Sequence, residues 1–446
     1  MSTDAVSPVP SSLRPDTPAA AWPPVLVTGA ESRPGLLVVR GLGRAGIPVL
    51  AAGSGPRPLG FASRYARVRQ AVPSAAADPD GFVDAVVDLA RREGAGLIMP
   101  ATESSLVALD ARRDDVDAAA PLAAAPSPAV RTSLDKRAML PLAAELGLDV
   151  PRTARGASAA ELLERTADFV FPLAIKPFGP GVLVEAQTGR SMDLKVTFAD
   201  DRAALARILG EWEDRAAGLI VQEYVQGLGV GVEGVYDRGR RVALLAYDRV
   251  RENPVTGGVA TIRRSIALPA DLAAGTDRLL ARLGWHGVGM TEWKRRPDGS
   301  YVFMELNGRF SAGGAVTMDS GFNFPHLVAA LFLGRPLPSF PPYALGVTER
   351  WLIGDLQALE RYAVARLEGP GSSVATRLPP ARRVLTDFVR DFRPGVGLDE
   401  VKGDDLRPLV PWLLDVASQA GRSAVRLAKA LLRPWVRRGR SLLQRK

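Results

Sequence analysis

One β-hairpin near residue 300 constrains this chain more than any other stretch. The segment Gly289–Phe310 reads GMTEWKRRPDGSYVFMELNGRF, and its Asp298-Gly299 pair follows Pro297. An Asp-Gly pair favours a two-residue hairpin loop, because the primed turns need positive φ at both central positions. The sequence therefore predicts two antiparallel strands that meet at this pair.

The predicted register places two acidic residues directly opposite each other. Glu292 faces Glu305, and Asn307 lies on the same face because side chains alternate along a strand. Facing like charges destabilise a sheet, whereas two carboxylates and an amide oxygen suit a hard cation such as Mg²⁺. The pattern alone leaves a second interpretation open, a solvated hairpin face on which Lys294 reduces the repulsion. The other face would pair Trp293 with Met304 and Thr291 with Leu306.

Composition excludes several classes of protein. The chain has 446 residues, enough for two or three domains, with 47% hydrophobic and 24% charged residues. No apolar run reaches the roughly 18 residues of a membrane-spanning helix. The absence of cysteine excludes disulfides and thiolate chemistry. Residues 1–23 are rich in Pro, Ser and Ala and lack a secretory pattern, so we expect a disordered tail and a cytoplasmic protein.

The positive charge is concentrated at the C-terminal end. From Pro411 onward there are nine Lys or Arg residues and one acid, Asp415, a net of +8 out of +9 for the whole chain. A nucleic-acid-binding body is therefore not expected. The region 337–446 reads as mainly helical, with helices over Tyr343–Ala363 and Val384–Phe392. Its basic end indicates either peripheral contact with an anionic membrane surface or a helix packed on the protein with a solvated basic face; Pro434 interrupts the pattern.

The N-terminal region, residues 24–125, alternates strands with helices. Short apolar strands are predicted at Val25–Gly29, Ile47–Ala52 and Leu97–Pro100, and this alternation is typical of a Rossmann-like parallel sheet. The helices between and after them are predicted at Pro34–Ala45, Asp80–Glu93 and Glu103–Arg112. The first turn reads TGAESRPG and lacks the G-x-G-x-x-G fingerprint, which disfavours a nicotinamide-dependent enzyme. We expect a scaffold domain that borders the active site.

Residues 126–336 carry the other candidate site residues. Only seven of the 57 basic residues are Lys, and Lys136 and Lys176 could converge on a polyphosphate. Lys136 lies in a predicted helix that Pro141 should kink or split. Residues 178–195 resemble either a mobile flap or an ordinary surface loop. Four arginines surround a Gly257-Gly258 turn and suit either an anionic substrate or solvent; they are Arg249, Arg251, Arg263 and Arg264.

The order of these features resembles the ATP-grasp superfamily, in the branch of the carbamoyl-phosphate synthase large subunit and biotin carboxylase. The motifs that carry the resemblance are SLDKRAML, FPLAIKP, IVQEYVQG, GMTEW and MELNGRF. They run in the family's order between about residues 24 and 336. The resemblance implies a two-lobed ATP-grasp domain over residues 126–336, between the Rossmann-like domain and the helical C-terminal region.

The resemblance also implies roles for particular residues. Lys136 and Lys176 match the two basic residues that hold the ATP phosphates, and Arg309 matches the arginine that steadies the transferred phosphoryl group. The adenine hinge matches Glu223, Tyr224 and Val225, and the Mg²⁺ ligands match Glu292, Glu305 and Asn307.

The chain departs from the family pattern at two points. The usual N-P-R motif reads Asn307-Gly308-Arg309, which keeps both side chains. Where many relatives carry a ribose-binding Glu, this chain has Val230 and Gly231, so Glu233 is the substitute.

The activity implied by the resemblance is an ATP- and Mg²⁺-dependent carboxylate–amine ligase that forms an acylphosphate, with Mn²⁺ as an alternative metal and small carboxylates and amines as substrates. The alternative is a catalytically silent, regulatory nucleotide-binding protein on the same fold.

Overall fold

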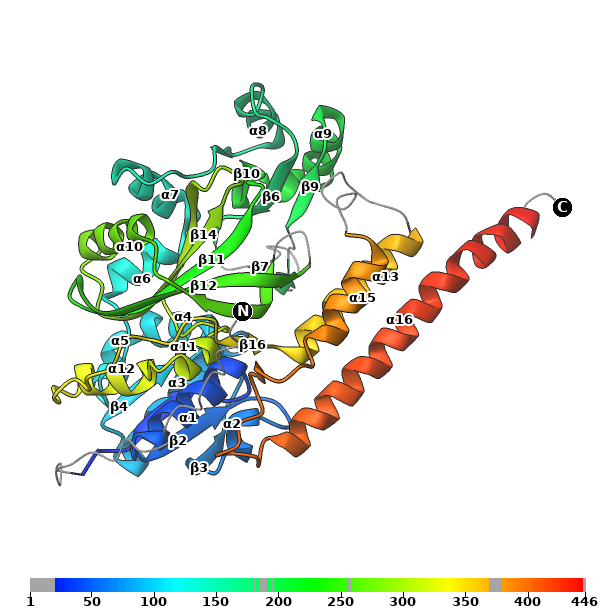
Figure 1. Cartoon of the computed structure of the whole chain (residues 1–446). Helices are drawn as coiled ribbons and strands as arrows, with labels where there is room; N and C mark the ends of the chain where they lie inside the picture. The colour runs from blue at the N-terminus through cyan, green and yellow to red at the C-terminus, as the bar shows by residue number, and fades with distance from the viewer. Residues whose placement is uncertain are drawn as a thin grey trace, which may run out of the picture.

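The computed structural model describes residues 21–179, 182–184, 191–193, 196–254, 258–368 and 379–443. The predicted tail over residues 1–23 therefore lies almost entirely outside the described residues. The described chain forms a parallel sheet at one end, a small and a large antiparallel-rich sheet at the other, and long C-terminal helices along one side (Figure 1).

The N-terminal sheet is parallel and has the order β3-β2-β1-β4, as the strand–helix alternation predicts. Its strands are β1 Val25–Thr28, β2 Val49–Gly53, β3 Ala66–Ala71 and β4 Leu97–Pro100, and its helices are α1 Arg33–Arg44, α2 Leu59–Ala62, α3 Pro79–Glu93, α4 Glu103–Ala111 and α5 Arg113–Asp117. The prediction missed the edge strand β3. Its ARVRQA sequence has only one fully buried residue, Ala66, so it lacks the apolar run that marks the inner strands.

The helix predicted around Lys136 is divided at Asp135 rather than at Pro141. Helix α6 spans Ser127–Leu134 and helix α7 spans Lys136–Glu145. The Asp135 carboxylate caps α7 by accepting the Arg137 N–H at 2.8 Å. Pro141 stays inside α7, and the carbonyl of Arg137, four residues before it, accepts a hydrogen bond from the Arg155 guanidinium at 2.9 Å. That bond replaces the one that proline cannot donate, so the helix continues.

Two further sheets form the middle of the chain. The smaller has the order β5-β10-β6-β9, and the larger has seven strands in the order β15-β14-β11-β12-β13-β16-β17. The smaller sheet comprises β5 Thr153–Arg155, β6 Leu173–Pro177, β9 Thr197–Ala199 and β10 Leu219–Glu223, with helices α8 Ala159–Arg165 and α9 Arg202–Glu211. The larger comprises β11 Leu228–Asp237, β12 Arg240–Asn253, β13 Val259–Ile266, β14 Gly287–Arg295, β15 Tyr301–Asn307, β16 Thr348–Arg350 and β17 Val396–Leu398, with helices α10 Ala270–Arg282, α11 Ala315–Asp319 and α12 Phe324–Phe332.

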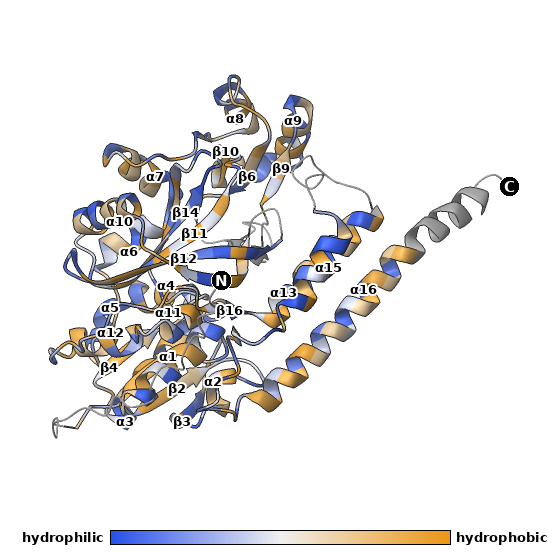
Figure 2. Cartoon of the chain, viewed as in Figure 1, coloured by the Kyte–Doolittle hydropathy of each residue, from blue (hydrophilic) through white to orange (hydrophobic). Residues whose placement is uncertain are grey.

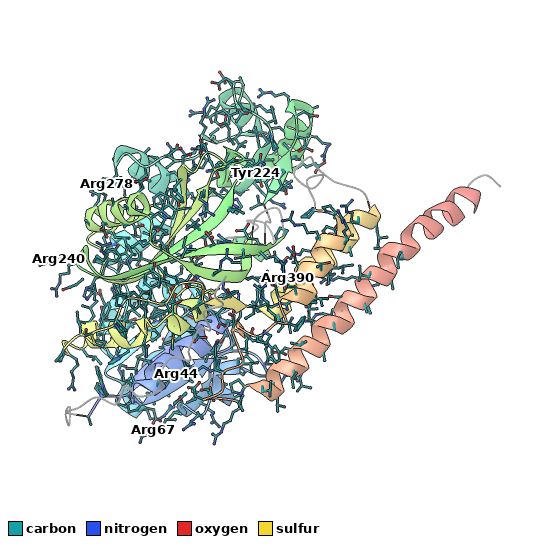
Figure 3. All side chains as sticks on the ribbon, in the orientation of Figure 1. Arg44, Arg67, Tyr224, Arg240, Arg278 and Arg390 are labelled. Atoms are coloured by element: carbon teal, nitrogen blue, oxygen red, sulfur yellow. The ribbon has the colours of Figure 1, made fainter. Side chains whose placement is uncertain are left out.

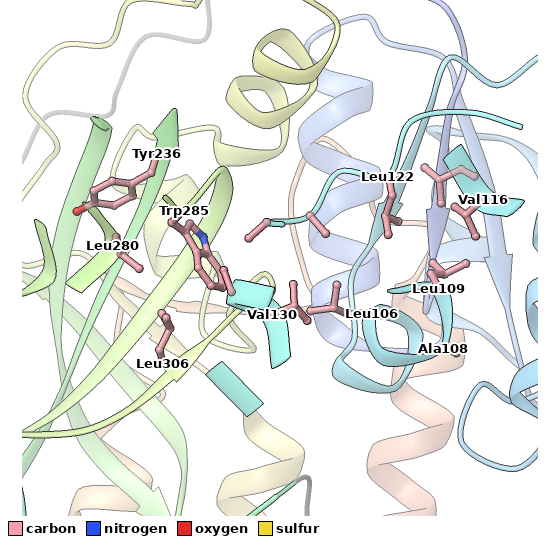
Figure 4. Packing of buried hydrophobic residues seen from close by; sticks show 14 of the residues in the cluster. Leu106, Ala108, Leu109, Val116, Leu122, Val130, Tyr236, Leu280, Trp285 and Leu306 are labelled. Atoms are coloured by element: carbon pink, nitrogen blue, oxygen red, sulfur yellow. The ribbon is translucent and has the colours of Figure 1, made fainter. Parts of the chain in front are cut away.

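One apolar core joins the N-terminal sheet to the large sheet. Figure 4 shows Val130 and Leu106 between Trp285 on one side and Leu109 on the other, all within one buried cluster. Trp285 is fully buried and donates its indole N–H to the Val288 carbonyl at 3.0 Å. The N-terminal domain therefore packs against the sheet that carries the predicted hairpin.

The C-terminal region contributes strands as well as helices. The helix predicted at Tyr343–Ala363 begins only at Leu352, because residues 348–350 form β16 and pair with β13. Helices α13 Leu352–Glu368, α15 Ala381–Arg390 and α16 Leu409–Leu443 complete the chain. The large sheet thus runs across the predicted domain boundary at residue 336. No helix of the described residues combines the length and apolar character that crossing a membrane requires.

The predicted flap is described only in part. Strands β7 Val182–Val184 and β8 Ser191–Asp193 pair antiparallel, and the intervening residues lie outside the described ones. The same holds for residues 255–257 at the predicted Gly257-Gly258 turn.

Candidate active site

The hairpin brings the two predicted acids face to face. Glu292 on β14 pairs with Glu305 on β15, and Thr291 pairs with Leu306, as the sequence predicts. Asn307, two residues after Glu305, follows on the same face of β15. The pairing of the two carboxylates is therefore confirmed.

The turn itself differs from the prediction. Five residues, 296–300, connect the strands, and the Arg296 N–H donates to the Ser300 carbonyl at 2.8 Å. Of the predicted loop pair, only Gly299 has positive φ, at 89°, because the Asp298 carboxylate instead accepts the Ser300 N–H. The primed two-residue turn is therefore not formed.

A β-bulge corrects the shifted register before the acids are reached. Trp293 pairs with Phe303 rather than with the predicted Met304, and the register changes between Glu292 and Trp293. Met304 is the extra residue on β15. It lines the same cavity as Glu305 instead of lying on the opposite face. Bulges re-aim side chains in this way, and here the bulge adds an apolar wall to the site.

Lys136 neutralises one of the facing acids. Its Nζ lies 3.1 Å from Glu305 Oε2, at the start of helix α7. The Lys136 ammonium lowers the pKa of the Glu305 carboxyl to about 2, and Glu305 in turn raises the pKa of Lys136. This ion pair keeps one negative and one positive charge in place at neutral pH.

Glu292 has a different partner and a different electrostatic environment. The Arg249 guanidinium on β12 forms an ion pair with Glu292 and a second one with Glu252, at 2.9 Å. Burial raises the pKa of the Glu292 carboxyl, and the Glu305 charge adds to this effect while Arg249 opposes it. Burial lowers the pKa of Arg249, but Glu292 and Glu252 outweigh it and raise that pKa. The negative charges of Glu292 and Glu305 are thus stabilised by the positive charges of Arg249 and Lys136.

Two glycines on β11 let the β12 side chains reach Glu292. Gly231 pairs with Tyr247 on one side and Glu292 on the other, so β11 separates the two. A Cβ on Gly231 would lie 2.3 Å from the Tyr247 ring, and one on Gly229 would lie 2.8 Å from the Arg249 side chain. Because Gly229 and Gly231 have no side chains, the side chains of Tyr247 and Arg249 can lie across β11. Gly231 stands where many relatives carry a ribose-binding Glu, and in this chain the packing of Tyr247 requires a glycine there.

Asn307 and Arg309 extend the polar face. The Asn307 amide nitrogen lies 3.4 Å from Glu292 Oε1 and 3.3 Å from Glu305 Oε1. Arg309 donates to the Asn307 Oδ1 at 3.3 Å and to the Phe310 carbonyl at 3.1 Å. One chain of contacts therefore links Lys136, Glu305, Asn307 and Arg309.

Lys176 lies at the end of β6, in the wall of the same cavity. Burial lowers the pKa of its ammonium to about 8, and the charge of Lys136 contributes to the same shift. Among the described residues no carboxylate forms an ion pair with Lys176, and an ammonium held next to another cation in this way is destabilised. A polyanion between Lys136 and Lys176 would remove that cost.

A cavity of about 440 Å³ lies between the small and the large sheet. Its volume suits a ligand of nucleotide size. Apolar walls come from both sheets and include Ala174, Val196, Phe198, Met290 and Met304.

The predicted hinge, residues 223–225, lines one side of this cavity. The Glu223 N–H donates to the Arg152 carbonyl and the Tyr224 N–H to the Pro172 carbonyl, which fixes the backbone after β10. Tyr224 packs edge-on against Phe198, with ring centroids 5.6 Å apart. Figure 3 shows Tyr224 beside the small sheet, in the upper part of the molecule.

Not every predicted site residue lines the cavity. Lys136 and Asn307 are not among its lining residues but contact Glu305, which is. Glu233 is buried behind the cavity, and its carboxylate accepts hydrogen bonds from the Ser311 N–H at 2.9 Å and the Thr317 hydroxyl at 2.8 Å. Arg251 forms ion pairs with Asp355 in α13 and with Asp391, which directly follows α15. Through these contacts Glu233 and Arg251 connect elements of the fold, and neither side chain is part of the cavity lining.

The remaining two arginines of the predicted cluster differ in exposure. Arg264 is half exposed, 4.0 Å from Asp248, and is not among the residues lining the cavity. Arg263 does line the cavity and is held by Asp399 and by the Ala260 carbonyl. Of the four arginines, Arg249 and Arg263 therefore reach the candidate site.

Sequence reasoning missed several residues that shape the site. Tyr247 lines the cavity and shares a hydrogen bond of 3.0 Å with Ser311. Asp399, which anchors Arg263, lies 136 positions further along the chain. The alternation of Gly229 and Gly231 was the available signal for Tyr247, since glycine in a strand marks a close approach. No local pattern indicates the Asp399 contact.

The acids at the site do not form an all-acidic metal cluster. Within the part of the chain that the structure describes, no group of three or more His, Asp or Glu side chains is arranged to hold a metal ion. The predicted ligand set contains two carboxylates, and its third member is the amide of Asn307. Magnesium binding therefore remains a prediction.

Comparison with known proteins identifies the fold. No family model matches the chain. The carbamoyl phosphate synthase large chain of Deinococcus radiodurans is 27% identical over 201 residues, and that of Deinococcus deserti is 25% identical over 201 residues. Each match covers 44% of this chain and 19% of the relative, so the chain corresponds to about a fifth of these curated relatives.

Solved structures match over a longer part of the chain. Biotin carboxylase from Campylobacter jejuni covers 73% of this chain and 74% of its own, with 16% identity and a TM-score of 0.57. An N5-carboxyaminoimidazole ribonucleotide synthetase in complex with ADP covers 78% and 86%, with 14% identity and a TM-score of 0.58. An L-amino acid ligase from Bacillus licheniformis covers 70% and 75%, with 16% identity and a TM-score of 0.54. The chain therefore has the ATP-grasp fold that these solved structures share, and a 201-residue part of it is similar in sequence to the carbamoyl phosphate synthase large chain.

Proposed function

We propose that this chain is an ATP-dependent ligase that activates a carboxylate as an acylphosphate and transfers the acyl group to an amine. The observation that carries the proposal is the pair of facing acids, Glu292 and Glu305, held across a cavity wall by Lys136 and Arg249. The solved structures with a similar fold include a biotin carboxylase with an ATP analogue and an amino-acid ligase, which supports the general reaction class.

ATP would enter between the two sheets. The backbone of Glu223 to Val225 would receive the adenine, with Phe198 and Met304 as the apolar walls on either side. The phosphates would then extend toward Lys176 and Lys136. The low pKa of Lys176 supports this placement, because a bound phosphate would supply a negative partner for its ammonium.

The facing acids fit a hard divalent cation. Their oxygens are the ligands that Mg²⁺ prefers, and Mn²⁺ accepts the same set. Asn307 fits as the third ligand if its side-chain amide is turned over, because Oδ1 then points at the two carboxylates that its nitrogen now contacts. The turn would break the hydrogen bond that Arg309 donates to Oδ1 and would release this guanidinium toward the phosphates. The metal would neutralise charge on the ATP phosphates.

The chemistry would be an in-line phosphoryl transfer followed by acyl transfer. A carboxylate oxygen of the substrate attacks the terminal phosphorus, and the bond to the ADP oxygen breaks. The amine nitrogen then attacks the acyl carbon, and inorganic phosphate leaves while the nitrogen loses a proton. Arg309 and the two lysines would stabilise the developing charge, so no protein residue needs to form a covalent bond.

The acid substrate would lie at the end of the cavity near Arg249 and Arg263. Both guanidiniums line it, and the Ser311 and Gly313 segment lies beside them. An anionic group at this position would meet two buried cations.

Hydroxylamine trapping tests the proposal without knowledge of the natural amine. Full-length protein, Mg·ATP and a panel of carboxylic acids are incubated with hydroxylamine, which converts an acylphosphate to a hydroxamate. We expect hydroxamate and ADP to form together with at least one acid. Tight ATP binding with no ADP release across a broad panel would instead favour the catalytically silent alternative, for which the Arg249–Glu292 ion pair is the supporting observation.

A further inference from the structure

The long C-terminal helix α16 presents an apolar stripe to solvent. Five large apolar side chains are half exposed or more on it: Val410 at 66%, Leu413 at 50%, Leu414 at 49%, Val425 at 55% and Leu431 at 56%. The small residues between them are exposed as well, and they are Ala417, Ala420, Gly421, Ala424 and Ala428. At 100° per residue these positions fall on one continuous side of the helix.

The protein body occupies a different side of the same helix. Trp412, Gln419 and Ala430 are the buried residues, and Trp412 packs in a cluster with Leu36 and Leu352. Gln419 contacts Glu360 of α13 at 3.3 Å. Because this packed side is already used, the apolar stripe has no partner among the described residues. In Figure 1, α16 forms the outer edge of the molecule, and Figure 2 shows apolar and polar patches alternating along it.

Basic residues border the stripe. Arg422 and Lys429 are exposed beside it, and Arg426 is held by Glu360 at 2.9 Å. Beyond residue 431 the sequence adds six more Lys or Arg residues and no acid. The only acid from Pro411 onward is Asp415, which lies 3.8 Å from Arg57.

We propose that α16 lies in the surface of an anionic phospholipid bilayer, with the stripe Leu413–Leu431 inserted at the level of the headgroups. An apolar face flanked by arginine and lysine is the chemistry that such a surface recognises. A second copy of this chain fits the stripe less well, because α16 contains seven Lys or Arg residues and one Asp, and two helices of net charge +6 would repel each other. This inference does not depend on the proposed ligase activity.

Vesicle co-sedimentation of the full-length protein tests the proposal. The probes are vesicles of phosphatidylcholine alone and vesicles with added phosphatidylserine. We expect binding only to the anionic vesicles, with affinity that falls as ionic strength rises.

Two pairs of substitutions separate the apolar and the charged contribution. Leu414→Asp with Leu431→Asp should weaken binding at least tenfold, since both side chains would otherwise be inserted. Arg422→Gln with Lys429→Gln should weaken it about fivefold per charge. All four residues are exposed, so folding should be retained, which thermal unfolding checks.

Matched controls carry the same chemical changes elsewhere on the surface. Val170→Asp replaces another exposed apolar residue, and Arg238→Gln removes another exposed charge. Neither should alter vesicle binding. Equal loss in the controls and the α16 variants would overturn the proposal, as would absence of binding to anionic vesicles.

Light scattering identifies the competing occupant. A wild-type dimer that becomes monomeric in the Leu414→Asp, Leu431→Asp variant, with no vesicle binding by either, would assign the stripe to a second copy and overturn the membrane assignment. A monomeric wild-type protein that binds anionic vesicles supports it.

Discussion

Replacing Glu305 with Gln removes one of the two facing carboxylates and leaves the side-chain volume almost unchanged. At the 3.1 Å between Lys136 Nζ and Glu305 Oε2, two unit charges attract by about 5 kcal/mol at an effective dielectric constant of about 20. Desolvation of both groups and relief of the repulsion with Glu292 offset part of this attraction. We therefore expect the free energy of unfolding to fall by about 1–3 kcal/mol.

The effect on nucleotide binding should depend on the metal. Loss of one anionic ligand should raise the dissociation constant of Mg·ATP by about 10–100-fold. Binding of ATP in the absence of divalent metal should change little, because two effects oppose each other. A negative charge that repels the phosphates disappears, but its loss also lowers the pKa of Lys176 and so weakens the positive charge there. Isothermal titration of both ligand forms against wild-type protein and Glu305→Gln measures this difference.

A matched control separates site chemistry from stability. Asp404 forms a carboxylate–guanidinium pair with Arg44 at 2.7 Å and does not line the cavity. Asp404→Asn should leave the affinity for Mg·ATP unaltered. If Glu305→Gln weakens metal-free ATP and Mg·ATP equally, or weakens neither, then Glu305 is not a metal ligand and the assignment of the site is wrong.

Three other outcomes follow from the described contacts. Lys176 has a pKa of about 8 in the free protein, so the affinity for ATP should fall as the pH rises above that value, and in Lys176→Arg it should not fall. The free energy of unfolding should rise between about pH 8 and pH 10.4, because the lysine keeps its proton to a higher pH in the unfolded chain. Binding and denaturation across pH 7–10 measure both effects, and a flat affinity profile would contradict the phosphate role. Gly231→Ala should cost about 1–3 kcal/mol of stability by displacing the Tyr247 ring, and Tyr247→Ala should relieve that cost in a double-mutant cycle; urea unfolding with additive losses would refute the clash. Asp399→Asn should cost about 3–5 kcal/mol, because it removes the carboxylate that pairs with buried Arg263 and with Arg33; a loss below about 1 kcal/mol in the same assay would contradict this anchoring role of Asp399.

The hairpin was predicted correctly in part. The Glu292–Glu305 pairing is correct although the turn from which it was derived is not. The loop has five residues rather than two, and the bulge at Met304 restores the register that the longer loop shifts. The sequence carries no mark of this bulge, because alternation is locally the same whether or not one residue is left unpaired.

The fold was predictable wherever burial leaves a pattern in the residues. The inner strands β1 and β4 are continuous apolar runs, whereas the edge strand β3 is not and was missed. The break at Asp135 was missed for a related reason. A proline normally outweighs other signals in a helix, but here Arg155, from a strand distant in sequence, satisfies the carbonyl that Pro141 leaves free.

The sequence by itself therefore determined the parallel N-terminal sheet, the facing acids and the apolar and basic character of the C-terminal helix, because each rests on periodicity or on charge along a continuous segment. Only the tertiary structure decided which charges meet: Lys136 with Glu305, Arg249 with Glu292, and Arg263 with Asp399. It also decided which side of α16 the body covers. These contacts join residues tens to more than a hundred positions apart, and packing between elements sets such distances, which no local pattern records.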